Sequence, residues 1–125
     1  MKRALTFAAV GEASTGLALL IVPGLVGRLL LGEELTGVAI PVARVAGIAL
    51  IALGVACWPG SDADSSPSRA LRAMLCYSLL TTLYLAYLGI GGERVGRLLW
   101  SAVAIHAILT TLLVRAWLKE HRASQ

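Results

Sequence analysis

Four long runs of apolar residues dominate the chain, separated by short polar or turn-forming stretches. The runs cover residues 4–22, 38–58, 70–90 and 98–118. A helix needs about 20 apolar residues to cross the ~30 Å hydrocarbon core of a bilayer, and each run meets that length. We therefore predict an all-α fold, an integral membrane four-helix bundle in which residues 1–125 form a single transmembrane domain.

The composition agrees with a membrane protein. Hydrophobic residues make up 58% of the 125 residues and charged residues 14%, with a mean hydropathy of +0.80. Soluble domains contain roughly 45–50% apolar and about 25% charged residues. The charged start followed by an apolar run resembles a signal peptide, but Glu12 inside the run and the length of the run favour a retained first helix.

The connections between the runs differ in character. Pro23 and Gly24 interrupt the first run, and the apolar spacing that follows predicts a short amphipathic helix at the membrane interface over residues 24–34. A continuous, kinked first helix is the alternative. Residues 59–68, PGSDADSSPS, are rich in turn formers and predict a hydrophilic cytoplasmic loop.

Small residues recur on one face of the second run. Ala43, Gly47, Leu50, Gly54 and Cys57 share this face at helical spacing. Helices in lipid associate through close contact at small residues. We expect the face to be buried against another helix.

Lysine and arginine are distributed unevenly between the two ends of the runs. Seven would lie on the side of the termini and three on the other side, with Arg44 inside a run. Because positive residues favour the cytoplasmic side, we predict a multi-pass membrane protein with both termini inside. The alanine, glycine, leucine and arginine usage favours the bacterial inner membrane. The bias accounts for the net charge of +4 without a nucleic-acid partner.

The pentapeptide VGRLL occurs twice, at residues 26–30 and 95–99. Both copies fall on the predicted outer side, and each places an arginine at the membrane edge. We expect Arg28 and Arg97 to contact lipid headgroups.

Three ionisable residues fall inside the predicted spans: Glu12, Arg44 and His106. At ~1.5 Å per residue all three reach similar depths near the middle of the bilayer. Such groups cost at least ~2.5–3.5 kcal/mol on insertion and normally find partners within the bundle. We therefore predict a Glu12–Arg44 pair with His106 as a third member. Polar residues at matching positions extend this predicted cluster: Tyr77, Thr81, Tyr84 and Thr110.

Three interpretations of the cluster remain open. It fixes helix register, it binds a lipid-like or quinone-like ligand, or it is a proton-coupled or catalytic site. No metal or other cofactor is predicted, because the spans hold a single histidine and Cys57 and Cys76 form no CxxC motif.

The stretches GEASTGLALLIVPGLVGRLLLG and ARVAGIALIALGVACW resemble small bacterial membrane proteins of the DoxX-like kind. The resemblance lies in a first helix with a polar residue and a proline-ended apolar run, followed by a helix with arginine and glycine. It implies a four-helix bundle. Some members of that group are subunits of quinone-linked oxidoreductases, and others assist membrane-protein assembly.

The stretch AAVGEASTG also resembles small multidrug-resistance transporters, which carry a proton-exchanging glutamate at this place in their first helix. The predicted neutralisation by Arg44, the clear charge bias and the long loop at 59–68 count against that family. We favour an accessory or scaffold protein over an enzyme, with its exact activity left open. The alternatives are a small proton-coupled transporter and a membrane enzyme or quinone-linked redox subunit. Membrane lipids, another membrane protein and further copies of the chain are the expected partners.

Overall fold

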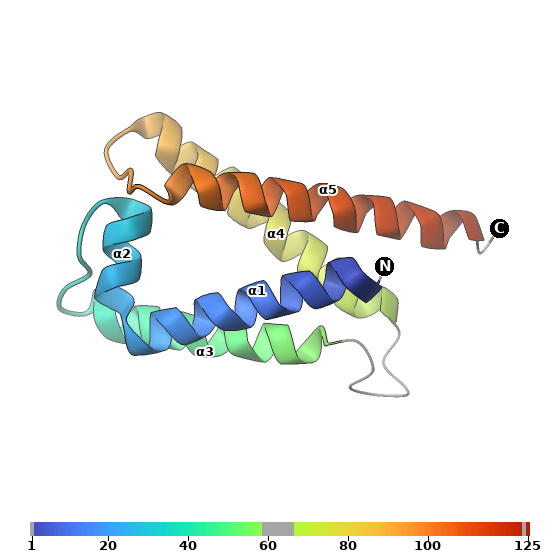
Figure 1. The fold of residues 1–125 in the computed structure, drawn as a ribbon, viewed down its shortest axis with the longest axis horizontal. Helices are drawn as coiled ribbons and strands as arrows, with labels where there is room; N and C mark the ends of the chain where they lie inside the picture. The colour runs from blue at the N-terminus through green and yellow to red at the C-terminus, as the bar shows by residue number, and fades with distance from the viewer. Residues whose placement is uncertain (1, 59–66, 124) are drawn as a thin grey trace.

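A computed structural model describes residues 2–58, 67–123 and 125. These residues form five helices and no strand (Figure 1), with the bounds α1 Lys2–Ile21, α2 Pro23–Leu31, α3 Ala39–Ala56, α4 Pro67–Gly91 and α5 Leu99–Ala123. Four stretches are long and apolar enough to cross a membrane: Lys2–Ile21, Ala39–Ala56, Arg69–Gly91 and Leu99–Ala123. The predicted all-α fold class is confirmed. Residues 59–66 of the predicted loop lie outside the described residues.

Helices α1 and α3 pack closely because glycines meet at their interface. A side chain added at Gly16 would place its Cβ 2.5 Å from the carbonyl oxygen of Gly47, and the reverse substitution gives the same 2.5 Å. A Cβ at Gly54 would lie 2.7 Å from the carbonyl oxygen of Ala9. The predicted small-residue face of the second span is therefore buried against the first span, as expected for helices that associate in lipid.

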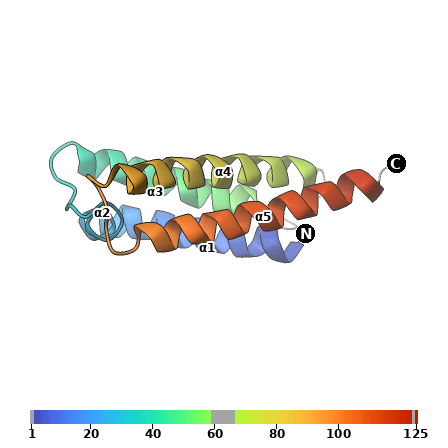
Figure 2. The same cartoon turned by 90° about the horizontal axis from the view of Figure 1, so that it is seen from above.

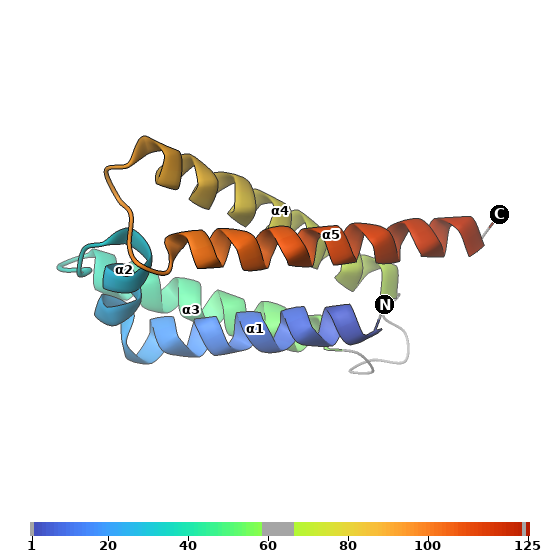
Figure 3. The same ribbon diagram turned by 45° about the horizontal axis from the view of Figure 1, so that its top comes forward.

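Helices α4 and α5 form the second closely packed pair. Gly89 makes room for Trp100, because a Cβ there would lie 2.8 Å from the indole ring. Toward its C-terminal end, α4 diverges from α3 (Figures 1 and 3). The molecule thus consists of two helix pairs, and α1 is the helix of the first pair that contacts both α4 and α5.

The hydrophobic core lies at the end of the bundle where the chain begins and ends (Figures 1 and 2). Helices α1, α4 and α5 contribute to it, as does Cys57, which directly follows α3. Its buried members are Leu5, Ala8, Ala9, Cys57, Leu71, Met74, Leu109, Leu113 and Ala116. The thiol of Cys57 lies 3.6 Å from the carbonyl oxygen of Ala70. This core joins the two helix pairs at one end.

The opposite end is closed by α2, a helix separate from α1. Pro23 occupies its first turn, where a missing N–H costs no hydrogen bond, and Gly32 ends it with a left-handed backbone, φ 79°. The prediction of a distinct short helix after the first span is therefore confirmed over the continuous alternative. Figure 1 shows α2 turned across the end of the bundle.

The two VGRLL copies contact each other at this end. The amide of Gly96 donates a hydrogen bond to the carbonyl of Leu30 (2.9 Å), and the amide of Leu98 donates to that of Leu29 (2.8 Å). Carbonyls in the last turn of a helix have no partner within the helix, so the second copy satisfies those at the end of α2. Gly96 fits because a Cβ there would overlap the Leu29 carbonyl.

Candidate functional site

Glu12 is the one carboxylate among the described residues that is buried, with 3% of its surface exposed. It belongs to α1 and reaches α5, where its Oε1 lies 3.4 Å from Nε2 of His106. This separation is a close polar contact, longer than a well-formed hydrogen bond. The contact joins the two helix pairs between the core at one end and α2 at the other.

The second ring nitrogen of His106 fixes the protonation pattern of the ring. Nδ1 lies 2.9 Å from the carbonyl oxygen of Ala102, one turn earlier on α5. A carbonyl oxygen only accepts hydrogen bonds, so Nδ1 must carry the hydrogen. In the neutral ring, Nε2 is then a bare acceptor that faces Glu12.

A bare nitrogen and an ionised carboxylate are both acceptors and repel each other. Two arrangements avoid this repulsion: a protonated Glu12 that donates to a neutral His106, or an ionised Glu12 beside an imidazolium. Both contain one proton between the two side chains. The Glu12–His106 contact can thus hold a single exchangeable proton inside the membrane.

Tyr77 on α4 completes the site. Its ring meets the His106 ring edge to face, with centroids 6.2 Å apart, and its side chain interacts with both Glu12 and Thr81. Of the predicted cluster, the structure brings together Glu12, His106, Tyr77 and Thr81. Thr110 lies one turn along α5 and donates its hydroxyl to the carbonyl of His106 (2.7 Å).

The structure does not bring Arg44 to Glu12. Among the described residues no ion pair includes Arg44, whose side chain is exposed. Arg44 and Val55 are 11 positions apart, so they leave α3 in directions only about 20° apart. Val55 lines a groove with Val10 on one flank of α1, whereas Glu12 faces α5 on another.

Tyr84 is also outside the site, with 62% of its surface exposed. It lies two turns beyond Tyr77, about 10 Å further along α4. The predicted depth placed Tyr84 near Glu12, but the structure brings Tyr77, two turns earlier on α4, to the site instead.

Two groups near the site were absent from the predicted cluster. One is the backbone carbonyl of Ala102, which a pattern of side chains along the sequence does not reveal. The other is Ser78, which follows Tyr77, is fully buried and has no hydrogen-bond partner for its hydroxyl among the described residues. Its spacing of four from Met74, another buried residue, was the available signal for its burial.

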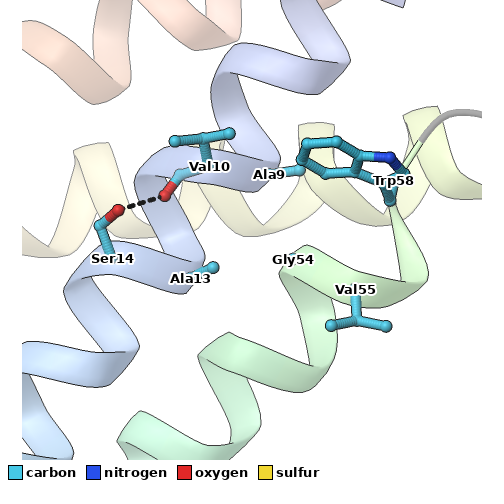
Figure 4. A pocket seen from close by; sticks show the side chains of 7 residues that line it. All are labelled: Ala9, Val10, Ala13, Ser14, Gly54, Val55 and Trp58. Atoms are coloured by element: carbon cyan, nitrogen blue, oxygen red, sulfur yellow. Dashed lines mark hydrogen bonds between the residues drawn. The ribbon is translucent and has the colours of Figure 1, made fainter.

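A groove runs between α1 and α3 on the flank that carries Val55 (Figure 4). It has a volume of about 390 Å³. Small side chains border it, and the Ser14 hydroxyl donates to the carbonyl of Val10, one turn earlier on the same helix (2.7 Å). The lining residues are Ala9, Val10, Ala13, Ser14, Gly54, Val55 and Trp58.

The arginines predicted to contact headgroups lie near α2 and are exposed. Arg28 forms an ion pair with Glu34. Arg97 forms no ion pair within the part of the chain that the structure describes. A second ion pair at this end joins Arg94 Nη1 to Glu33 Oε2 at 2.8 Å and links the two inter-helix connections.

Within the described ranges, no group of three or more histidine, cysteine, aspartate or glutamate side chains is placed to hold a metal ion. No protein-family model, curated protein or solved structure matches the chain. The function of the protein is therefore inferred from the geometry of the helices and of the Glu12 site.

Proposed function

We propose that this protein is a small multi-pass membrane accessory protein that binds a transmembrane helix of a partner membrane protein along the groove between α1 and α3. The observation that carries the proposal is Arg44, an exposed arginine within a span that has no carboxylate partner among the described residues.

An ionisable side chain in a span normally pairs within a bundle, because its insertion costs at least ~2.5–3.5 kcal/mol. Arg44 lies five residues after Ala39, roughly 8 Å along α3. It shares the flank of α3 that carries Val55 and the groove. A partner helix on this flank could place a carboxylate beside Arg44, in the half of the membrane nearer α2.

The groove has the features that helix association in lipid requires. In the absence of a hydrophobic driving force, helices approach at small residues and gain packing contacts. Ala13 and Ser14 supply such small side chains. The partner segment should therefore be a transmembrane helix with small residues facing the groove and one acidic residue toward its outer end.

The resemblance of the sequence layout to DoxX-like proteins, some of which assist membrane-protein assembly, points in the same direction. Our proposal includes the bacterial inner membrane as the location, with both termini in the cytoplasm. The charge bias supports this orientation, and both termini lie at one end of the bundle, as an even number of spans requires (Figure 1).

A photo-crosslinking amino acid at position 14 tests the proposal in native membranes. We expect one discrete protein adduct, which should be lost in the Arg44→Gln variant. In the Ser14→Leu variant the photo-crosslinking amino acid is placed at position 55 instead, and the adduct should be lost there as well. The matched control is Ser101→Leu, the same change at an exposed serine on α5. An adduct of twice the chain mass would assign the groove to a second copy, and crosslinks to lipid alone would refute the proposal.

The Glu12–His106 contact favours a second candidate, a small proton-coupled transporter. Glu12 faces a residue that can itself take up the proton, whereas a permanently charged Arg44 would have held Glu12 ionised. In proteoliposomes, this candidate requires uptake of an organic cation that depends on an imposed pH gradient and stops in Glu12→Gln. Equal uptake by wild type and variant would remove it.

A further inference from the structure

A second groove lies at the opposite corner of the molecule from α2, between the first turns of α1 and the last turns of α5. It has a volume of about 490 Å³. Three cationic side chains line it: Arg3 from α1, and Arg115 and Lys119 from α5. Figure 3 shows these parts of the two helices near the end where both termini lie.

The three cations have no counter-charge in the described part of the chain. Its ion pairs are Arg28–Glu34, Arg94–Glu33 and His106–Glu12, all elsewhere. Glu120 follows Lys119 directly, and neither belongs to an ion pair within the described ranges. Arg115 and Lys119 are four residues apart and therefore lie on one face of α5, where like charges repel. A bound anion would remove this repulsion.

The rest of the groove is apolar. Phe7 lies one turn from Arg3 and is 68% exposed, and Leu112 lies one turn before Arg115 and is 41% exposed. Both point into the same groove as the cations. A ligand that fits this arrangement carries a negative charge at one end and an apolar chain at the other, with the chain directed toward the middle of the membrane.

We propose that this groove binds the headgroup phosphate of an anionic phospholipid, with an acyl chain against Phe7 and Leu112. Basic pockets between transmembrane helices on the cytoplasmic side bind such headgroups. The long side chains of Arg115 and Lys119 can extend toward the membrane surface while their stems stay in the apolar region. This inference does not depend on the partner helix proposed above, which occupies another face.

The test uses the full chain reconstituted in vesicles of equal parts phosphatidylglycerol and phosphatidylcholine, extracted gently and analysed by native mass spectrometry. We expect wild type to retain phosphatidylglycerol in preference to phosphatidylcholine. The variant Arg3→Gln/Arg115→Gln/Lys119→Gln should lose this preference by roughly two orders of magnitude, at about fivefold for each cation. Phe7→Ser should also lower retention, although it changes no charge.

The matched control is Arg69→Gln/Arg72→Gln/Arg122→Gln, which removes three cations near the same end without touching the groove. It should retain the lipid. An equal loss in this control would reduce the effect to general surface charge and overturn the proposal. The variant Arg3→Lys/Arg115→Lys keeps the positive charges and should retain the lipid. Retention would show that the glutamine variant loses the lipid through its missing charges and not through misfolding. Complete competition by inorganic phosphate alone would assign the groove to free phosphate instead.

Discussion

Glu12 on α1 and His106 on α5 face each other across the boundary between two helix pairs, with 3.4 Å between Oε1 and Nε2. The other nitrogen of the ring is already engaged by the Ala102 carbonyl. The arrangement between the two side chains is therefore restricted: Glu12 either donates a hydrogen bond to Nε2 or accepts one from it.

This restriction predicts different results for two substitutions of Glu12. Glu12→Gln supplies an amide N–H that can donate to Nε2, so the loss in the free energy of unfolding should be small. Glu12→Leu leaves Nε2 buried without a donor, which costs about 1–3 kcal/mol. Unfolding in mixed micelles, followed by circular dichroism, measures both. Equal losses would show that the contact does not depend on a donor at position 12.

A double-mutant cycle measures the contact itself. We expect Glu12→Leu and His106→Leu to couple by roughly 0.5–2 kcal/mol, the range for polar contacts between helices in membranes. The double variant should recover part of the stability lost in Glu12→Leu, because no unpaired polar atom remains. Glu12→Leu combined with Tyr84→Leu is the control cycle and should be additive, since Tyr84 is outside the site. Coupling in the control would indicate a rearrangement of α4.

Gly47 should be intolerant of any side chain. A Cβ there would lie 2.5 Å from the Gly16 carbonyl oxygen, so Gly47→Ala must push α1 away from α3. We expect a loss of about 1–3 kcal/mol, typical of overpacking. Gly11→Ala is the matched control, because nothing lies within 4 Å of its Cβ position. That change should leave stability unaltered or raise it slightly, owing to the better helix propensity of alanine.

The contact between the VGRLL copies can be tested at Gly96. Gly96→Ala would overlap the Leu29 carbonyl and break the hydrogen bonds to the end of α2. We expect faster hydrogen exchange at the amides of residues 96 and 98, with the distant core unaffected. Gly91→Ala, where a Cβ meets nothing within 4 Å, is the control. Unchanged exchange in Gly96→Ala would mean that the two copies do not hold each other in the membrane.

The Arg94–Glu33 ion pair should contribute little to stability. Its side chains are 58% and 69% exposed, and exposed pairs are worth about 0–1 kcal/mol. Glu33→Gln should therefore change the unfolding free energy by less than about 1 kcal/mol, and the difference should vanish in high salt. A salt-independent loss would indicate that Glu33 is buried in an assembly.

The spans could be predicted because hydropathy determines them, and a fixed helical rise assigned each polar residue an expected level along the bundle. Glu12 and His106 were placed at similar depth in this way, and they meet. The direction in which each side chain leaves its helix depends in addition on which helices are neighbours. Arg44 was expected to face Glu12, but it lies on another flank of α3.

The information needed to place Arg44 was partly present in the sequence. The face that contains Gly47 and Gly54 was expected to be buried, and it is. Its partner on α1, Gly16, was not identified, so the rotation of α3 relative to Glu12 stayed open. Tyr84 illustrates a different limit, since the level at which α4 packs against α5 has no local sequence signal.

The hydrogen bonds between the two VGRLL copies also bear on the order in which the molecule is built. The ion pair beside them joins residues 61 positions apart, and α2 leaves the ribosome well before the turn that docks on it. Helices α1 to α3 can pack through Gly16 and Gly47 while the rest is still being synthesised. The carbonyls at the end of α2 lack these hydrogen-bond partners until the connection between α4 and α5 has been made. Closure at this end thus requires residues 96 and 98 to be synthesised, and a chain stalled before them would present an unfinished edge at the membrane surface.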